Sequence, residues 1–176
     1  QIFKQLQSTN NKYFTKLTGN QGDVMKESVH CSLTAAINYI ENNKDKYNID
    51  NLEEYMEKNC KNGFHIHTPS TSTPKDGPSA GCAFTTAFIS RILNKKIHNT
   101  VGMTGEIELN GNITKIGGLE FKLYGAKKAN INTVYIPEDN KQDLIEIKKK
   151  YKNLIDNTFN VFTVKNISEI IDKILI

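Results

Sequence analysis

The chain has 176 residues, a formal net charge of +4, 38% hydrophobic residues and 24% charged residues. These values are ordinary for a globular protein, and the length predicts one compact domain, residues 1–176, whose core needs no disulfide or metal to fold. The lysines are mixed with acidic residues and Arg91 is the only arginine. Because specific nucleic-acid contacts usually rely on arginine, we expect none from this domain.

Three cysteines, Cys31, Cys60 and Cys82, stand at irregular spacing. An odd number without a regular pattern is not a disulfide framework and indicates a reducing compartment. No apolar stretch approaches the roughly 20 residues of a membrane span, so no membrane contact is expected. The first residues carry no visible targeting segment.

In chain order, the hydrophobic pattern predicts alternating strands and helices. Strands are expected at 2–6, 13–17, 63–68, 101–104, 107–109, 113–116, 133–136 and 159–164. Helices are expected at 23–40, 52–58, 79–93, 119–129, 141–150 and 167–175. Asn110-Gly111 is a strong hairpin signal between two of the strands. The expected class is therefore α/β with a mixed sheet, with helices packed on the sheet.

The first candidate for chemistry is the segment Asp76-Gly77-Pro78-Ser79-Ala80-Gly81. Ser79 is expected where a helix begins, and backbone N–H groups at a helix N-terminus are unpaired and partly positive. A serine there can attack a carbonyl while neighbouring N–H groups bind the oxyanion. For an isolated motif of this kind, a serine that only caps the helix is the more common explanation.

A serine nucleophile needs a base, and Lys122 is an unusual candidate. Leu119, Lys122, Leu123 and Ala126 have the i, i+3, i+4, i+7 spacing of a core-facing helical stripe. A lysine in an apolar site loses hydration and gives up its proton more readily. The alternative is a lysine that extends from the edge of the stripe into solvent. Gly117-Gly118 before it would allow close backbone approach.

His65 and His67 are two residues apart on an expected strand, so their rings lie on one face. With Cys60 they form a weak zinc pattern that matches no usual spacing, and roles in hydrogen bonding to the following loop or in lining a cleft are preferred. Thr104 and Glu106 flank Gly105, where they can orient a base or serve as turn residues. No phosphate-binding glycine motif is present, so the chain is not expected to hydrolyse ATP.

Three blocks of the sequence resemble the proteolytic domain of Lon proteases. The run TPKDGPSAG at 73–81 resembles the segment around their nucleophile, and the run from MTGEIEL to NKQDL at 103–144 resembles the segment with their catalytic lysine. LTGNQGDVMKES at 17–28 is similar to the start of their first long helix. The blocks occur in family order, and the similarity extends from about residue 15 to the C-terminus.

The resemblance implies the Lon proteolytic-domain fold and a serine–lysine dyad of Ser79 and Lys122. It also implies supporting roles for five further residues, which are His65, His67, Asp76, Thr104 and Glu106. Lon proteins carry an AAA+ ATPase module and an N-terminal region that are absent here, and their opening strand is expected to be truncated before Gln1. The domain itself is expected to use no cofactor or metal, whereas the ATPase module would use ATP and Mg²⁺.

The expected activity is an ATP-dependent serine endopeptidase that cleaves unfolded or regulatory proteins in protein quality control. The expected partners are such substrates, the AAA+ module of the parent chain and identical copies in a hexameric ring. The alternative is a ring-assembly module that is inert without the ATPase. The expected compartment is the mitochondrial matrix, with bacterial cytoplasm as the alternative.

Overall fold

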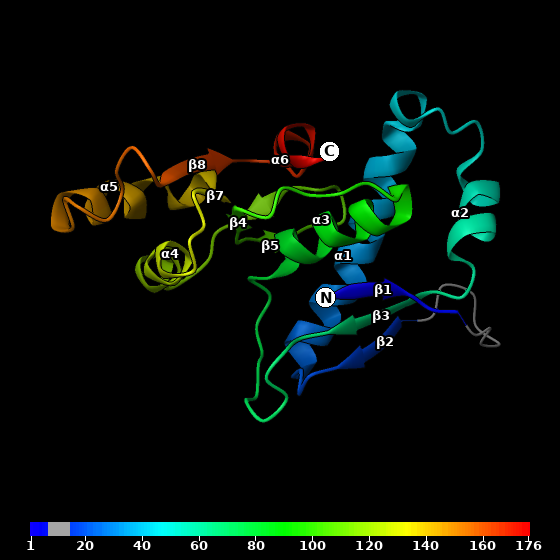
Figure 1. The fold of residues 1–176 in the computed structure, drawn as a ribbon, viewed down its shortest axis with the longest axis horizontal. Coiled ribbons are helices and arrows are strands. Elements are labelled where there is room, and N and C mark those ends of the chain that lie inside the picture. The colour runs from blue at the N-terminus through cyan, green and yellow to red at the C-terminus, as the bar shows by residue number, and fades with distance from the viewer. Residues whose placement is uncertain (7–14) are drawn as a thin grey trace.

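The computed structural model describes residues 1–6 and 15–176, and these form helices that pack on three small sheets. In chain order the elements are β1 (Ile2–Lys4), β2 (Thr15–Thr18), α1 (Asp23–Asn42), η1 (Lys44–Tyr47), α2 (Leu52–Cys60), β3 (Phe64–His67), α3 (Gly81–Leu93), β4 (Val101–Met103), β5 (Glu106–Ile107), β6 (Ile113–Thr114), α4 (Leu119–Lys128), β7 (Thr133–Pro137), η2 (Glu138–Asn140), α5 (Lys141–Lys150), β8 (Asn160–Val164) and α6 (Ser168–Ile174). Figure 1 shows their arrangement.

The predicted elements are confirmed, with shifts of a few residues at their ends. Helix α1 continues two residues beyond the expected end at 40, and α5 has the expected bounds. The expected strand at 13–17 lies partly outside the described residues, and its described part is β2. None of the described helices combines the length and hydropathy that a membrane crossing requires.

The sheets mix strand directions, as the sequence predicts. The first sheet has the order β1-β3-β2, in which β3 pairs antiparallel with β1 and parallel with β2. The second, β4-β7-β8, is parallel throughout. Strands β5 and β6 form the expected hairpin, closed by a turn in which the Gly111 N–H donates to the Glu108 carbonyl at 2.9 Å and Gly111 has φ +86°.

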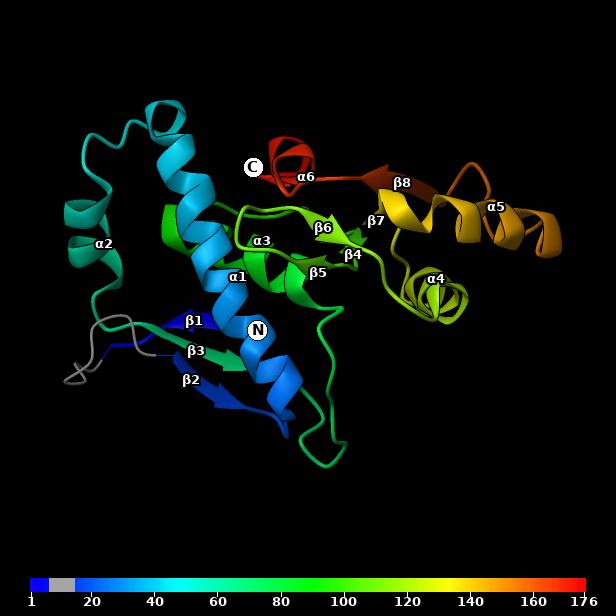
Figure 2. The same cartoon turned by 180° about the vertical axis from the view of Figure 1, so that it is seen from behind.

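Two hydrophobic clusters meet at strand β7. The main cluster includes the buried faces of α1, α3, α6 and β3, and the second includes those of α4, α5 and β7. Successive side chains of a strand point to opposite faces, so Tyr135 belongs to the main cluster while Val134 and Ile136 belong to the second. Figures 1 and 2 show α4 and α5 on the side of the molecule away from α1 and α2. The fold therefore has two packed halves joined by one sheet.

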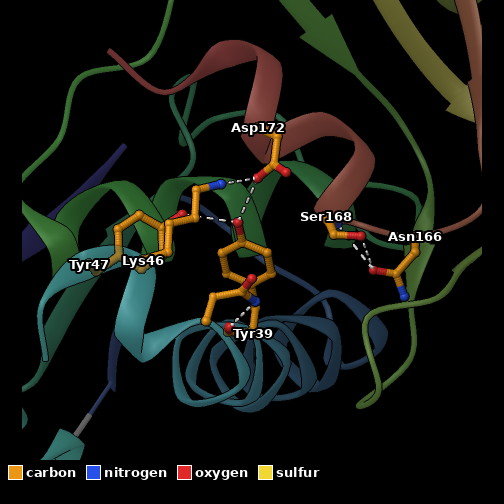
Figure 3. Close-up of polar contacts among 7 residues, drawn as sticks. Tyr39, Lys46, Tyr47, Asn166, Ser168 and Asp172 are labelled. Atoms are coloured by element: carbon orange, nitrogen blue, oxygen red, sulfur yellow. Dashed lines mark hydrogen bonds and ion pairs between the residues drawn. The ribbon is translucent and has the colours of Figure 1, made fainter. Parts of the chain in front are cut away.

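A polar network joins α6 to the first long helix (Figure 3). Tyr39 of α1 donates its hydroxyl to Asp172 at 3.1 Å and contacts the Tyr47 hydroxyl at 3.0 Å. Lys46 of η1 donates to the same carboxylate at 2.5 Å. Burial, followed by the hydrogen bond with Tyr47, raises the pKa of Tyr39, and the Lys46 hydrogen bond lowers the pKa of Asp172. The last helix is thus held to a segment about 130 residues earlier.

Candidate active site

Ser79 lies in a tight turn immediately before α3. The Gly81 N–H donates to the Pro78 carbonyl at 2.9 Å, and Ala80 has φ −90° and ψ 0°, which is typical of the third residue of a type I turn. The helix begins at Gly81, two residues later than the sequence predicts. Pro78 is the first residue of this turn and supplies the carbonyl that accepts its hydrogen bond. Ser79 is consequently a turn residue and not the first residue of the helix.

The carbonyl of Ser79 is fixed by the β4–β5 connection. The buried Thr104 hydroxyl donates to it at 3.1 Å, and the Gly105 N–H donates at 2.9 Å. In return, the Cys82 N–H donates to the Gly105 carbonyl at 3.0 Å. A Cβ added at Gly81 would lie 2.9 Å from the Ile107 backbone nitrogen, so only glycine permits this approach. These contacts give the turn a defined place against β5.

Two backbone donors beside the Ser79 hydroxyl remain free. In residues 1–6 and 15–176, the N–H groups of Ser79 and Ala80 donate no hydrogen bond, whereas those of Gly81 and Cys82 are used within the protein. Free N–H groups in a turn before a helix favour negative charge nearby. The turn therefore presents donors that can stabilise an oxyanion.

Lys122, on α4, reaches Ser79 from the other half of the molecule. Its Nζ lies 3.0 Å from the Ser79 Oγ, although the residues are 43 positions apart. Helix α4 is held by Leu119 and Leu123, which are buried in the second cluster. The pair thus combines a side chain from each cluster, and the distance is a normal one for hydrogen bonding.

The expectation that Lys122 is buried in the core-facing stripe is wrong. Lys122 is exposed, while Leu119 and Leu123 are buried and Ala126 is half-buried. At about 100° per residue, Lys122 lies some 60° to one side of Leu119, at the edge of the stripe. A long side chain at this edge extends outward from the core, as the alternative drawn from the sequence expected.

The expected role of Gly117-Gly118 is also corrected. A Cβ at either glycine would meet no atom within 4 Å, so the pair does not allow close backbone approach. Gly118 instead has φ +66° and ψ 30°, a left-handed conformation, at the N-cap of α4. Glycine adopts this conformation without the steric cost that other residues incur. Gly118 therefore sets the direction in which α4 leaves the preceding segment, and Lys122 is carried by this helix.

Asp76 caps helix α1 instead of touching the Ser79–Lys122 pair. Its Oδ1 accepts from the backbone N–H groups of Met25 and Gly77, each at 2.8 Å. These hydrogen bonds, that of Met25 first, lower the pKa of Asp76. A carboxylate at a helix N-terminus also interacts favourably with the helix dipole. Asp76 thereby ties the loop before Ser79 to the start of α1.

His65 and His67 share one partner on the neighbouring strand. The Thr18 hydroxyl lies 2.9 Å from His65 Nε2 and 2.8 Å from His67 Nδ1, which confirms that both rings lie on one face. The expected hydrogen bonds to the following loop are wrong, because the parallel register places Thr18 opposite His67. Sequence reasoning missed Thr18, since no local spacing indicates strand pairing across 49 residues.

The structure does not bring Cys60 and the two histidines together as metal ligands. Cys60 is buried in the main cluster at the end of α2, where burial raises the pKa of its thiol. In the described parts of the chain, no group of three or more His, Cys, Asp or Glu side chains is placed to hold a metal ion. Nor does a hydrogen bond within these parts join the histidines to Ser79 or Lys122.

Glu106 is exposed at the start of β5 and does not contact the Ser79–Lys122 pair. It lines a small pocket of about 160 Å³ beside Pro78, together with Val24, Glu27, Ser28, Cys31 and Ile107. Of the five predicted supporting residues, Thr104 and Asp76 hold the segment around Ser79, the histidines lie on the first sheet, and Glu106 lies in the neighbouring pocket. Glu27, which also lines this pocket, was not singled out in the sequence, because nothing in its local sequence marks it.

Comparisons with known proteins show which family the chain belongs to. The family model described as "Lon protease (S16) C-terminal proteolytic domain" matches residues 5–176. A "Lon protease homolog" of Acanthamoeba polyphaga mimivirus is 53% identical over 156 residues, which cover 89% of this chain and 14% of the relative. "Lon protease" of Finegoldia magna is 41% identical over 162 residues, covering 92% of this chain and 19% of the relative.

A third relative, "Lon protease" of Lachnoclostridium phytofermentans, is 44% identical over 160 residues, covering 91% of this chain and 18% of the relative. The chain therefore spans less than a fifth of the length of these relatives. The match nevertheless includes nearly the whole chain and all three blocks noted in the sequence. The chain belongs to the family of Lon protease C-terminal proteolytic domains.

Proposed function

We propose that this chain is a serine endopeptidase domain in which Ser79 is the nucleophile and Lys122 is the general base. The observation that carries the proposal is the 3.0 Å contact between the Ser79 Oγ and the Lys122 Nζ. A nucleophile and a base within hydrogen-bond reach are the geometric requirement for acyl transfer. Family membership supports the same activity.

The reaction has two halves. Neutral Lys122 takes the Ser79 proton as the serine oxygen attacks the peptide carbonyl, and the free N–H groups of the turn stabilise the oxyanion. The protonated amine then gives its proton to the leaving nitrogen, and an acyl-enzyme remains. Lys122 next takes a proton from the water that attacks the ester and returns it to the Ser79 oxygen as the ester bond breaks, which frees the carboxylic acid product and restores the enzyme.

Because Lys122 is exposed, we infer that the bound substrate contributes to the surroundings in which the proton is transferred. Only a neutral amine has the lone pair that accepts the serine proton. A peptide that lies across the turn would exclude water from the amine and strengthen the hydrogen bond to Ser79. The bound substrate would thus complete the surroundings of the Ser79–Lys122 pair.

The relatives are named Lon proteases or a Lon protease homolog and are several times longer than this chain, which supports a proposal about the parent protein. We infer that an AAA+ module of the parent protein, using ATP and Mg²⁺, delivers unfolded or regulatory proteins to the domain, and that identical copies form a hexameric ring. The relatives named above come from a giant virus and from bacteria. Localisation in the mitochondrial matrix, or alternatively in bacterial cytoplasm, remains a prediction.

The alternative is a ring-assembly module that is inert without the ATPase. The short Ser79–Lys122 distance in the chain alone favours the peptidase, since an unformed site would leave these side chains apart. The two proposals differ in one measurable property, which is the reactivity of Ser79 in the isolated domain.

The test is covalent labelling by a peptidyl β-lactone over a pH series, with the adduct located by mass spectrometry. We expect labelling at Ser79 that becomes faster as pH rises, because the base acts only after losing its proton. Ser79→Ala and Lys122→Ala should remain unlabelled. Labelling of Lys122→Ala at the wild-type rate would exclude this lysine as the base, and no labelling of Ser79, even with an ATPase module attached, would contradict the peptidase activity.

A further inference from the structure

A pocket of about 160 Å³ lies directly beside the turn that holds Ser79. Pro78, the residue before Ser79, forms one wall, and the first half of helix α1 forms another. The Ser28 hydroxyl donates to the Pro78 carbonyl at 3.3 Å, so this helix is joined to the turn. The pocket is smaller than the roughly 300 Å³ of typical small-molecule sites. Its size and position suit one side chain of a peptide that reaches Ser79.

The lining of this pocket is apolar with two acidic groups. Val24, Cys31 and Ile107 contribute apolar surface, and Glu27 and Glu106 contribute carboxylates from α1 and β5. Neither carboxylate has a hydrogen bond or an ion pair within residues 1–6 and 15–176. An unpaired carboxylate at the mouth of a pocket can therefore bind a cation without first breaking another contact.

No cationic side chain lines the pocket. Lys26, which precedes Glu27, forms an ion pair with Asp23 at 3.0 Å. The Lys122 amine contacts the Ser79 hydroxyl. The two carboxylates therefore remain available for a positive group that enters from outside.

We infer that this pocket is a specificity subsite for a lysine or arginine side chain of the peptide substrate, with Glu27 as a specificity-determining residue. The inference rests on the proposed peptidase function. The methylene stem of the substrate side chain would pack on Val24 and Ile107, and its charged end would approach Glu27 and Glu106. Neither this pocket nor a larger one of about 530 Å³ has Ser79 or Lys122 in its lining, but only the smaller pocket includes Pro78, the residue that precedes Ser79, whereas the larger one is lined by residues of 124–128 and 151–154.

The test is competition between short peptides and a peptidyl β-lactone for Ser79. Each hexapeptide carries one lysine, placed at each position in turn, and a matched set carries norleucine, which has a similar stem but no charge. At one position we expect the lysine peptide to protect Ser79 about three- to fivefold better than the norleucine peptide, which is the size of effect expected for an exposed ion pair. The difference should shrink at high ionic strength.

The matched variants are Glu27→Gln and Glu41→Gln. Both glutamates lie on α1, but Glu41 is about 21 Å further along the helix axis and lines a different pocket. Glu27→Gln should reduce the preference for lysine to less than about twofold, whereas Glu41→Gln should retain it. Glu27→Lys should make the norleucine peptide the better competitor, because the new lysine would repel the lysine of the peptide.

Cys31 offers a second readout that does not depend on charge. It is the partly exposed cysteine of the pocket wall, whereas Cys60 and Cys82 are buried, and burial raises the pKa of the Cys82 thiol to about 12. Iodoacetamide should therefore modify Cys31 first. The added group would fill the pocket and remove the preference for lysine, while Cys31→Ser treated in the same way should keep it.

The outcomes separate the two proposals. If Ser79 is labelled but no position favours lysine, or if Glu27→Gln keeps the full preference, the subsite is wrong and the peptidase function stands. If no probe labels Ser79, the proposed function fails and this inference fails with it.

Discussion

At the residue scale, the two members of the central pair are positioned differently. Backbone hydrogen bonds fix Ser79, whereas the position of Lys122 depends on the helix that carries it. The Ser79 carbonyl has two donors, from Thr104 and Gly105. Lys122 is exposed, and within the described residues its amine donates a hydrogen bond to the Ser79 hydroxyl. The serine position is therefore rigidly set, while the lysine geometry depends on how α4 is packed.

Replacement of Lys122 by arginine separates charge from basicity. Lys122→Arg keeps the positive charge and the reach, but arginine does not lose its proton in proteins. We expect a loss of at least about 10²-fold in Ser79 labelling, the lower range for removal of a general base. Lys128→Arg on the same helix is the control and should react like the wild type. Activity retained in Lys122→Arg would show that the lysine acts only through its charge.

The Thr104 hydroxyl is expected to act by positioning Ser79. Thr104→Val keeps the volume but removes the donor to the Ser79 carbonyl, while Thr104→Ser keeps the donor. We expect Thr104→Val to lower the labelling rate about tenfold and the free energy of unfolding by about 1 kcal/mol. Thr104→Ser should restore the rate. If the serine variant is as slow as the valine variant, the methyl group and not the hydroxyl is responsible.

The Asp76 carboxylate is expected to make the stability of the fold depend on pH. Its carboxylate accepts two backbone N–H groups, which hold its pKa below the ordinary value of 3.8. Since the pKa is lower in the folded state, the stabilisation is fully present above about pH 4 and is lost as the pH falls through the folded pKa. Asp76→Asn should therefore have a lower Tm than the wild type at pH 7, and the two values should converge in acid.

The control for Asp76 is Asp50→Asn, because Asp50 is exposed. Thermal unfolding followed by circular dichroism at pH 7, 5 and 3 would give the comparison. A Tm difference for Asp76→Asn that stays constant over this range would mean that the amide disturbs packing and that the carboxylate charge is not involved.

At the scale of elements, helix α4 is the part whose packing fixes the reactive distance. Leu123 has no exposed surface and belongs to the second cluster. Leu123→Ala should lower the free energy of unfolding by about 2–5 kcal/mol, as for other buried leucines. Ser79 labelling should also fall under conditions where the variant is still folded, since α4 can then shift.

Phe121→Ala is the comparison for this helix, because 76% of the Phe121 surface is exposed. Its unfolding free energy should change by less than about 0.5 kcal/mol. Denaturation in urea measures both variants. A folded Leu123→Ala protein with unchanged labelling would show that the Ser79–Lys122 distance does not depend on this packing.

At the scale of the whole molecule, the site lies where two packed halves meet. Ser79 precedes a helix of the main cluster, and Lys122 belongs to a helix of the second. Strand β7 joins the halves, with Tyr135 on one side and Ile136 on the other. A change in the relative position of the halves therefore acts directly on the reactive pair.

The network of Figure 3 ties the end of the chain into the main half. Asp172→Asn removes the ion pair with Lys46, and we expect the free energy of unfolding to fall by less than about 1 kcal/mol at pH 7, because both side chains are about half exposed to solvent. The Lys46 hydrogen bond lowers the pKa of Asp172, so the loss should disappear in acid. Urea denaturation at pH 7 and pH 3 measures it, and a loss that persists at pH 3 would contradict the electrostatic cause.

Much of the fold could be predicted from the sequence, because hydrophobic periodicity and turn residues are local properties of the chain. The start of α1, both bounds of α5, the hairpin at Gly111 and the α/β class all follow from such patterns. The start of α3 was predicted two residues too early. Small residues make up both the turn that begins at Pro78 and the start of the helix, so no change in residue type marks the boundary.

The sequence by itself determined the family, the segment that carries the serine and the helix that carries the lysine, since these depend on residue types at fixed spacing, whereas the structure placed Ser79 in a turn before α3. The tertiary structure alone decided the 3.0 Å contact between Ser79 and Lys122, the exposure of that lysine, and the hydroxyl of Thr18 between two histidines. The same holds for the pocket that joins Glu27 to Glu106. These features bring together side chains far apart in the chain, and their distances depend on how helices and strands pack, which no local pattern encodes.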